Sequence, residues 1–299
     1  MDHKIETITC GFNFCLALSA KKQVFAWGIN SHGCLGLGDT EMRHTPTEIV
    51  ALDELGVDSV AAGEYHVLAS TERGLYSWGW NGNGQLGHSG IEDSHVPMEV
   101  PALHGGRILD ISCGNAHSAA VVSSGDERTS VYLWGNNMYE QLGMEDVQHC
   151  EKPTAVKQLI DKIVIEIECG AFHTAVLTES GQVLLAGANL KGQLGLGREI
   201  TSTPVFQEPP VLMDKHVRNV FCGAFNTAFL VARQWVDDAE TDSCMTCRKN
   251  FTMRIRRHHC RNCGGIFCNS CSSKTAAILK YGITRPVRVC DTCHVKLSR

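Results

Sequence analysis

R-R-H-H-C-R-N-C, residues 256–263, places basic side chains around two cysteines near the C-terminal end of the chain. Cys260 and Cys263 form one of four Cys-x2-Cys pairs, and such a pair makes a tight turn that aims both sulfurs at one metal ion. Eight thiolates are enough for two tetrahedral Zn2+ sites. The predicted ligands are Cys244, Cys247, Cys260, Cys263, Cys268, Cys271, Cys290 and Cys293.

The spacing of the four pairs indicates how they share the two metals. Only four residues separate Cys263 from Cys268, which is too few for the second and third pairs to share one ion comfortably. We therefore expect pairs one and three to bind one Zn2+ and pairs two and four to bind the other. A disulfide-rich or redox segment is the alternative, and the regular paired spacing disfavours it.

The basic residues near the zinc ligands predict a site for a multiply charged anion. Arginine grips phosphate in a bidentate way, and a metal-held turn fixes where the side chains point. The alternative is a solvated basic face, which is less consistent with charges placed directly beside metal ligands. The predicted anion-binding cations are Arg256, Arg257, His258, His259, Arg261 and Arg288.

Three motifs in this segment together resemble those of the FYVE zinc finger family. They are W-V-D-D with Trp235 and Asp238, the full R-R-H-H-C-R from residue 256, and R-V-C ending at Cys290. The resemblance implies a headgroup pocket for phosphatidylinositol 3-phosphate. In that pocket the Arg and His side chains would hold the 3- and 1-phosphates, and Asp238 would meet inositol hydroxyls.

The resemblance also implies a short turret that enters the bilayer between the first ligand pair and the basic motif. Thr252, Met253 and Arg254 occupy the corresponding positions. Met253 suits an apolar wedge, whereas Arg254 stands where the family often has an uncharged residue.

Composition predicts a cytoplasmic protein whose membrane contact is peripheral, and the resemblance to FYVE fingers implies that the membrane is that of the early endosome. Eight of the 15 cysteines are assigned to zinc, and the other seven lack pair spacing, which fits a reducing compartment. The first residues lack the apolar core of a signal peptide, and no apolar run reaches the roughly 18 residues that a membrane span needs.

The net charge of −5 hides an asymmetry along the chain. Residues 244–299 hold 12 Lys and Arg against one acidic residue, whereas residues 1–243 hold 15 against 31. The acidic main segment argues against a nucleic-acid partner. The basic end suits an anionic lipid surface, where each nearby cation contributes roughly 1 kcal/mol.

The first 232 residues contain two alternating motifs. W-G-x-N-x-x-G-Q-L-G or a close variant begins at Trp27, Trp78, Trp134 and Ala186. A small residue–Gly–x–x–His motif, with variants, is centred on Gly11, Gly63, Gly114, Gly170 and Gly223. Periods near 50 residues with short β-like stretches are typical of propeller blades. These repeats resemble the regulator of chromosome condensation family, a match that is specific for the fold and much weaker for function.

Counting two strands per motif copy predicts 18 strands in the repeats. Residues 217–232 then form half a blade, because the chain runs on into Trp235 where the next W-G strand is due. We therefore expect an all-β chain with two domains. A partial or shortened β-propeller of about four to five blades occupies residues 1–232, and a small two-zinc cross-brace FYVE domain occupies residues 233–299. The chain would be a shortened version of a longer propeller protein.

The repeated polar residues are interpreted as structural. His66, His117 and His173 occupy one equivalent position per repeat, which is not how a ligand cluster is built. Asn30, Asn81, Asn137 and Asn189 are predicted to hydrogen-bond their own loops.

Two hypotheses of function follow, and neither is enzymatic hydrolysis or transfer, because no nucleophile–base set is evident. The favoured one is an endosomal adaptor, in which the finger binds phosphatidylinositol 3-phosphate and the repeats bind a protein partner. The alternative is a guanine-nucleotide exchange factor for an endosomal small GTPase. A RING-type ubiquitin ligase also interleaves two zincs, but it usually has a His ligand and does not require the basic motif.

Overall fold

The computed structural model describes residues 4–125, 128–213, 215–232, 235–279 and 283–298. The chain divides into two compact units, Met1–Leu230 and Val231–Arg299, called here the repeat unit and the finger unit. The domain boundary expected between residues 232 and 233 adjoins residues 233–234, which lie outside the described residues.

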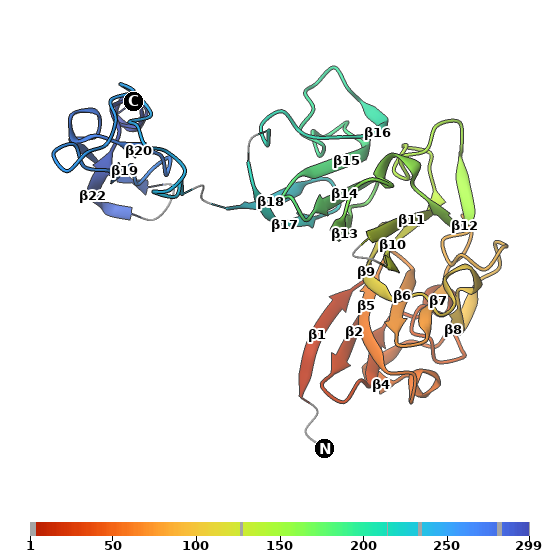
Figure 1. The fold of residues 1–299 in the computed structure, drawn as a ribbon. Helices are drawn as coiled ribbons and strands as arrows, with labels where there is room; N and C mark the ends of the chain where they lie inside the picture. The colour runs from red at the N-terminus through yellow and green to blue at the C-terminus, as the bar shows by residue number, and fades with distance from the viewer. Residues whose placement is uncertain (1–3, 126–127, 214, 233–234, 280–282, 299) are drawn as a thin grey trace. The chain divides into compact units, whose positions relative to one another are not determined.

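Four sheets of four antiparallel strands, the blades, follow one another along the repeat unit (Figure 1). The first contains β1 (Ile5–Cys10), β2 (Phe14–Ser19), β3 (Val24–Gly28) and β4 (Arg43–Glu48). The second contains β5 (Val57–Ala62), β6 (His66–Thr71), β7 (Gly74–Gly79) and β8 (Ser94–Glu99). The third contains β9 (Ile108–Cys113), β10 (His117–Gly125), β11 (Arg128–Asn136) and β12 (His149–Ala155). The fourth contains β13 (Val164–Cys169), β14 (His173–Thr178), β15 (Val183–Ala188) and β16 (Ser202–Gln207).

A two-stranded sheet ends the repeat unit. It pairs β17 (Val217–Cys222) with β18 (Thr227–Val231), and no further strand joins it among the described residues. The prediction of 18 strands ending in half a blade is confirmed. An all-β chain with four to five propeller blades is therefore the fold that the sequence led us to expect. We call the β17–β18 sheet the half-blade.

Each blade places its second and third strands between neighbouring sheets, which explains their composition. Strands β6, β14 and β15 are buried along their whole length, so their small and apolar residues pack on both faces. Trp78 and Trp134 are the largest fully buried side chains. The Nε1–H of Trp134 donates to the carbonyl of Gln85 in the preceding blade at 2.8 Å, which ties one sheet to the next.

The asparagines at the repeated W-G-x-N position hold the long loops that follow each W-G strand. In the first blade the Nδ2 of Asn30 donates to the carbonyl of Asp39 at 2.8 Å, while its Oδ1 accepts from the N–H of Leu35 at 2.8 Å. The same pair of interactions recurs at Asn81, Asn137 and Asn189. The prediction that these side chains bond their own loops is confirmed.

A ladder of histidines connects successive sheets in the interior. The Nε2 of His66 lies 3.0 Å from the hydroxyl of Ser118, and that hydroxyl donates to the carbonyl of Gln85 at 2.7 Å. The histidine must therefore be the donor to the hydroxyl. His117 and His173 make the same contact with Thr174 and Thr227 of the following sheets. These histidines lie between sheets, as their structural interpretation required.

The finger unit is small and contains little regular structure. Its elements are β19 (His258–His259), β20 (Ile266–Phe267), the 3-10 turn η5 (Asn269–Cys271), β21 (Lys274–Ile278), β22 (Ile283–Val289) and α1 (Asp291–Leu297). Strand β19 pairs with β20, and β21 pairs with β22. No helix in the described part of the chain is long and apolar enough to cross a membrane.

Candidate metal centres and anion site

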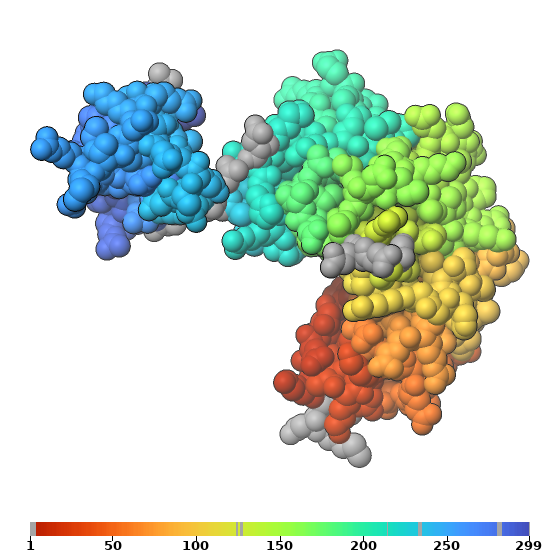
Figure 2. All heavy atoms as spheres, in the orientation of Figure 1, coloured from red at the N-terminus to blue at the C-terminus, as the bar shows by residue number. Residues whose placement is uncertain are grey.

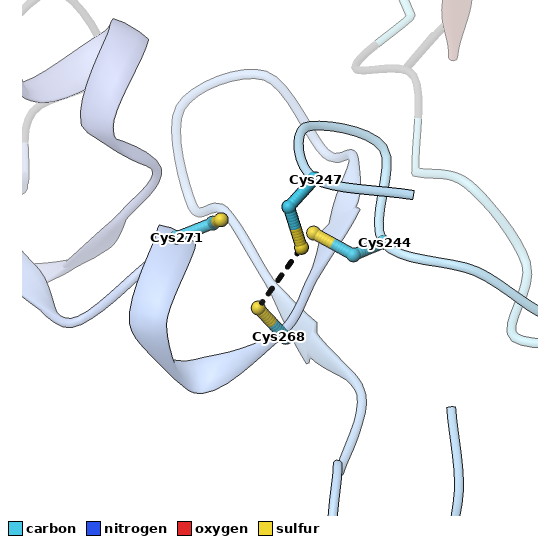
Figure 3. A group of neighbouring side chains, drawn as sticks. All are labelled: Cys244, Cys247, Cys268 and Cys271. Carbon is cyan, nitrogen blue, oxygen red and sulfur yellow. Dashed lines mark hydrogen bonds between the residues drawn. The ribbon is translucent and has the colours of Figure 1, made fainter. Parts of the chain in front are cut away.

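The eight paired cysteines of the finger unit gather into two sets of four. One set contains Cys244, Cys247, Cys268 and Cys271, and the other contains Cys260, Cys263, Cys290 and Cys293. These are the first-with-third and second-with-fourth combinations that the spacing predicted. Figure 3 shows the four sulfurs of the first set turned toward a common centre.

The sulfur positions fit tetrahedral zinc. Within each set the Sγ atoms lie within 4.8 Å of one another, and the Sγ atoms of Cys247 and Cys268 are 3.7 Å apart. Four sulfurs bound tetrahedrally at a Zn–S distance of about 2.3 Å would be about 3.8 Å apart. Each set can therefore hold one Zn2+, and together they account for two zinc ions per chain.

Hydrogen bonds favour the thiolate form of two zinc ligands, Cys260 and Cys268, while the pKa values of their partners Cys263 and Cys271 are raised. A hydrogen bond from the Cys263 thiol, supported by backbone N–H groups, lowers the pKa of Cys260 to about 4. The Ser270 hydroxyl likewise lowers the pKa of Cys268 to about 6. In the second set the Asn262 side chain donates to the Sγ of Cys293 at 3.1 Å. Each set thus contains a cysteine whose negative charge is stabilised before any metal binds.

Trp235 organises one group of the predicted anion-binding residues. Its ring stacks on His259 with centroids 4.5 Å apart, and the Arg261 guanidinium lies 4.9 Å from the Trp235 ring centroid. The Nε2–H of His259 donates to the carbonyl of Val236 at 2.8 Å and lies 3.7 Å from the carboxylate of Asp238. The structure therefore places His259 and Arg261 against the indole, with Asp238 beside His259.

A second group forms around His258. Burial, followed by the positive charges of Arg288 and Arg256, lowers the pKa of His258. The Arg288 guanidinium is held by the Asn269 side chain at 3.0 Å and the Ser272 carbonyl at 2.9 Å. Three cationic or potentially cationic groups thus share one neighbourhood, which an anion would stabilise.

Arg257 has partners of its own in this structure. Its guanidinium donates to the carboxylate of Asp242 at 3.0 Å and lies 5.0 Å from the centroid of the Phe251 ring. The Asp242 side chain is almost fully exposed, so this ion pair is readily exchanged for another anion.

A hollow of about 820 Å3 lies beside β22 and is lined by Arg261, Arg285 and Arg288 together with intervening residues of the strand. Arg285 was missed by the motif-based prediction because it lies outside R-V-C. Its position three residues before Arg288 in R-P-V-R was the available signal.

The predicted turret is a tight turn at the surface. The N–H of Thr252 donates to the carbonyl of Ile255 at 3.0 Å, and the Thr252 hydroxyl accepts from the N–H of Ile255 at 3.1 Å. Met253 at the tip is 96% exposed. The turn therefore presents an apolar side chain with no protein cover, flanked by the exposed Arg254.

The repeat unit also contains a cavity, about 650 Å3, lined by the inner strands and Gly-x-x-His loops of all five sheets. Glu168 lines this cavity and forms a hydrogen bond with the backbone of Cys222 in the next sheet. Burial raises the pKa of Glu168 to about 7, and the nearby Glu166 accepts from the N–H of Val220 at 3.4 Å. Burial also raises the pKa of Cys169 well above its usual value, so this thiol is a poor nucleophile.

These features define an all-β propeller unit followed by a two-metal finger with a basic surface. The chain belongs to the RCC1-like domain family, whose sequence pattern matches residues 1–236. Its C-terminal segment, residues 234–299, is a FYVE zinc finger. Both resemblances noted in the sequence are confirmed.

Relatives of the repeat unit carry different functional names. Over 196 residues the chain is 37% identical to the ultraviolet-B receptor UVR8 of Arabidopsis thaliana, covering 65% of this chain and 44% of the relative. It is 35% identical to the human probable E3 ubiquitin-protein ligase HERC6, covering 75% of this chain and 22% of that relative. The chain therefore spans less than half the length of these relatives. Among solved structures, human WBSCR16 superposes with a TM-score of 0.67 at 25% identity, covering 77% of this chain and 58% of that structure.

Proposed function

We propose that this chain is a peripheral adaptor of the early endosome membrane. In this proposal the finger unit binds phosphatidylinositol 3-phosphate from the cytoplasmic side, and the repeat unit binds a protein partner. The chain carries a FYVE domain, a class of lipid-binding domain found in membrane trafficking, next to RCC1-like repeats.

The clustering of Arg256, His258 and Arg288 is the observation that carries the lipid-binding half of the proposal. Burial and the two neighbouring guanidinium groups lower the pKa of His258, and a bound phosphate would supply the negative charge that favours its protonated form. Asp238 lies beside His259 in the group around Trp235, where its carboxylate can accept hydrogen bonds from inositol hydroxyls. The phosphates would be held by cations and the ring by Asp238.

The remaining predicted residues fit subsidiary roles in this proposal. Arg257 would exchange the exposed Asp242 carboxylate for a lipid phosphate, because an exposed ion pair is weak. Met253 would enter the acyl region while Thr252 and Arg254 stay at the headgroup level. The repeat unit would bind the protein partner, and relatives named as an ultraviolet-B receptor and a probable ubiquitin ligase show that RCC1-like repeats serve in proteins of different function.

Headgroup specificity is tested by measuring how the full chain binds vesicles that contain phosphatidylinositol 3-phosphate, its 4-phosphate isomer, or phosphatidylserine at equal charge. We expect strong binding to the 3-phosphate only. Arg256→Gln should reduce it by more than tenfold, because a charge-assisted phosphate contact contributes about 1.5–3 kcal/mol. Lys296→Gln, which removes an exposed cation from α1, is the matched control and should change binding less than twofold.

Equal binding to the two isomers would contradict headgroup recognition and leave only general attraction to anionic lipid. Full binding by Arg256→Gln, with two zinc ions retained in native mass spectrometry, would remove this arginine from the site.

Turret insertion is tested separately by Met253→Ala, which should weaken vesicle binding but not binding of a soluble headgroup. Val295→Ala, which trims a half-exposed apolar residue on α1, is its control.

A further inference from the structure

The contacts between neighbouring sheets of the repeat unit follow one rule. The second strand of each blade presents apolar side chains to the next sheet. They pack against aliphatic residues at the first and fourth positions of that sheet's first strand. At the last junction, Ala175 and Leu177 of β14 pack in one cluster with Val217 and Val220 of β17. The fourth-position residues of β5, β9, β13 and β17 are at most 7% exposed.

The half-blade presents the same kind of face, and among the described residues no further sheet covers it. Leu230 of β18 stands where Leu18, Val121 and Leu177 stand in the first, third and fourth blades, while the second blade has Ser70 there. Leu230 is 54% exposed, whereas its three aliphatic counterparts are at most 2% exposed. Ala228 on the same face is exposed as well. In the sequence the finger unit follows directly after the half-blade, so no later repeat of this sequence covers the face.

Strand β1 carries the residues that complete such a junction. Ile5 and Ile8 occupy its first and fourth positions, the places that Val217 and Val220 occupy in β17. Ile8 is 62% exposed and Ile5 is 40% exposed, so this face is not covered by the rest of the repeat unit. Figure 1 shows β1 and the half-blade at opposite ends of the row of blades. In Figure 2 the first residues of the repeat unit, in red, lie at its surface.

We infer that the half-blade face of one copy of this chain binds the β1 face of a second copy, with Leu230 and Ala228 packing on Ile5 and Ile8. The internal junctions of the repeat unit show that these two kinds of face fit each other, and the occupant is therefore a second copy rather than an unrelated partner. The contact is heterologous, because each copy uses a different surface.

A backbone hydrogen bond supports the fit. At two of the four internal junctions, a side chain at the third position of one first strand accepts from the fourth-position N–H of the next. The Asp110 carboxylate accepts from the N–H of Ile167 at 2.7 Å, and Glu166 makes the same kind of contact with Val220. Asn219 holds this third position in the half-blade, and its side-chain oxygen is an acceptor for the N–H of Ile8 in the second copy.

Sedimentation velocity of the full zinc-loaded chain over a range of concentrations, in buffer without lipid, tests this inference. We expect concentration-dependent self-association. Ile8→Asp and Leu230→Asp should each be monomeric over the same range, because a carboxylate would be buried at the junction. Ile165→Asp is the matched control, since the second position of a first strand faces solvent within the repeat unit, and it should associate like the unchanged protein.

A mixture of the two monomeric variants provides the sharpest readout. Ile8→Asp keeps an intact half-blade face and Leu230→Asp keeps an intact β1 face, so an equimolar mixture should form dimers that grow no larger. A monomeric unchanged protein at every concentration would overturn the inference without any variant. Association that persists in both variants would assign it to other surfaces, and a mixture of folded variants that stays monomeric would exclude the heterologous junction.

Discussion

Between the first two blades the buried cluster consists almost entirely of aliphatic side chains with one indole, among them Leu16, Val24 and Trp78. In the finger unit, five of the eight buried members of the core cluster are zinc-ligand cysteines. The repeat unit is thus stabilised by apolar surface removed from water, which its sequence contains in every blade. The finger unit is too small to bury much apolar surface and relies on metal bonds in its place. Conditions that remove the metal should therefore unfold the finger unit and leave the repeat unit folded.

Chelation should have the largest effect. Structural zinc contributes on the order of 10–16 kcal/mol to small zinc domains, so its removal should unfold the finger unit and leave the blades folded. Limited proteolysis after treatment with a strong chelator in reducing buffer should cleave within residues 244–297 and spare the repeat unit. Native mass spectrometry should count two zinc ions before treatment and none after it.

Re-addition of Zn2+ is the control and should restore protease resistance. If the chelated chain kept the same cleavage pattern as the zinc-loaded chain, the finger unit would owe its stability to its few apolar residues. The contrast between the two units would then be wrong.

The complementary change removes an apolar anchor from the blades. Trp134 is fully buried in a cluster shared by the second and third blades, so Trp134→Ala should destabilise the repeat unit by about 3–5 kcal/mol. The zinc content of the Trp134→Ala protein should stay at two ions per chain. Trp80→Ala, at a half-buried indole that contacts the Tyr65 and His32 rings, should cost much less.

Denaturant unfolding followed by far-ultraviolet circular dichroism measures both variants. Equal destabilisation by the two substitutions would mean that the indole of Trp134 is no special anchor. Loss of zinc from Trp134→Ala would show that the two units do not fold independently.

Sequence spacing alone was sufficient for much of this fold. The repeat period located every sheet of the repeat unit, and the missing W-G strand after Ala232 predicted the half-blade. The four-residue gap between Cys263 and Cys268 predicted which cysteines share a metal. These features depend on chain connectivity and residue spacing, which sequence states directly.

Partners that depend on side-chain direction were not predictable in the same way. The basic motif indicated a cup of cations, but not that Arg257 pairs with Asp242 or that Arg288 is held by a backbone carbonyl. The repeated histidines indicated a structural role, but the hydroxyl that each one contacts lies more than 50 residues away. Such contacts are set by how sheets pack against each other, and a pattern within one repeat does not contain that information.

Head-to-tail association would also bear on the proposed function. An assembly of two copies would place two finger units on one membrane, and linked binding sites gain avidity without new contacts. Vesicle binding by Ile8→Asp should then be weaker than that of the unchanged protein, while binding of a soluble headgroup stays the same.

The smallest effect we predict distinguishes a complete blade from the half-blade by its pH dependence. Burial lowers the pKa of His173 to about 4, whereas Asn226 occupies the equivalent position in the half-blade and does not titrate. A histidine with a lowered pKa in the folded state stabilises fully above its unfolded pKa of about 6.5, and this contribution is lost as the pH falls toward 4. Between pH 7.5 and 5.5 the loss should be about 1.4 kcal/mol for this one residue.

Glu168, whose pKa is raised to about 7, acts in the opposite direction, so the pH dependence of the unchanged protein's unfolding free energy combines both effects. The measurement is therefore the difference in unfolding free energy between the unchanged protein and His173→Asn at the two pH values. The variant should lose about 1.4 kcal/mol less on acidification than the unchanged protein. Parallel losses in both proteins would mean that His173 titrates as freely in the folded state as in the unfolded chain.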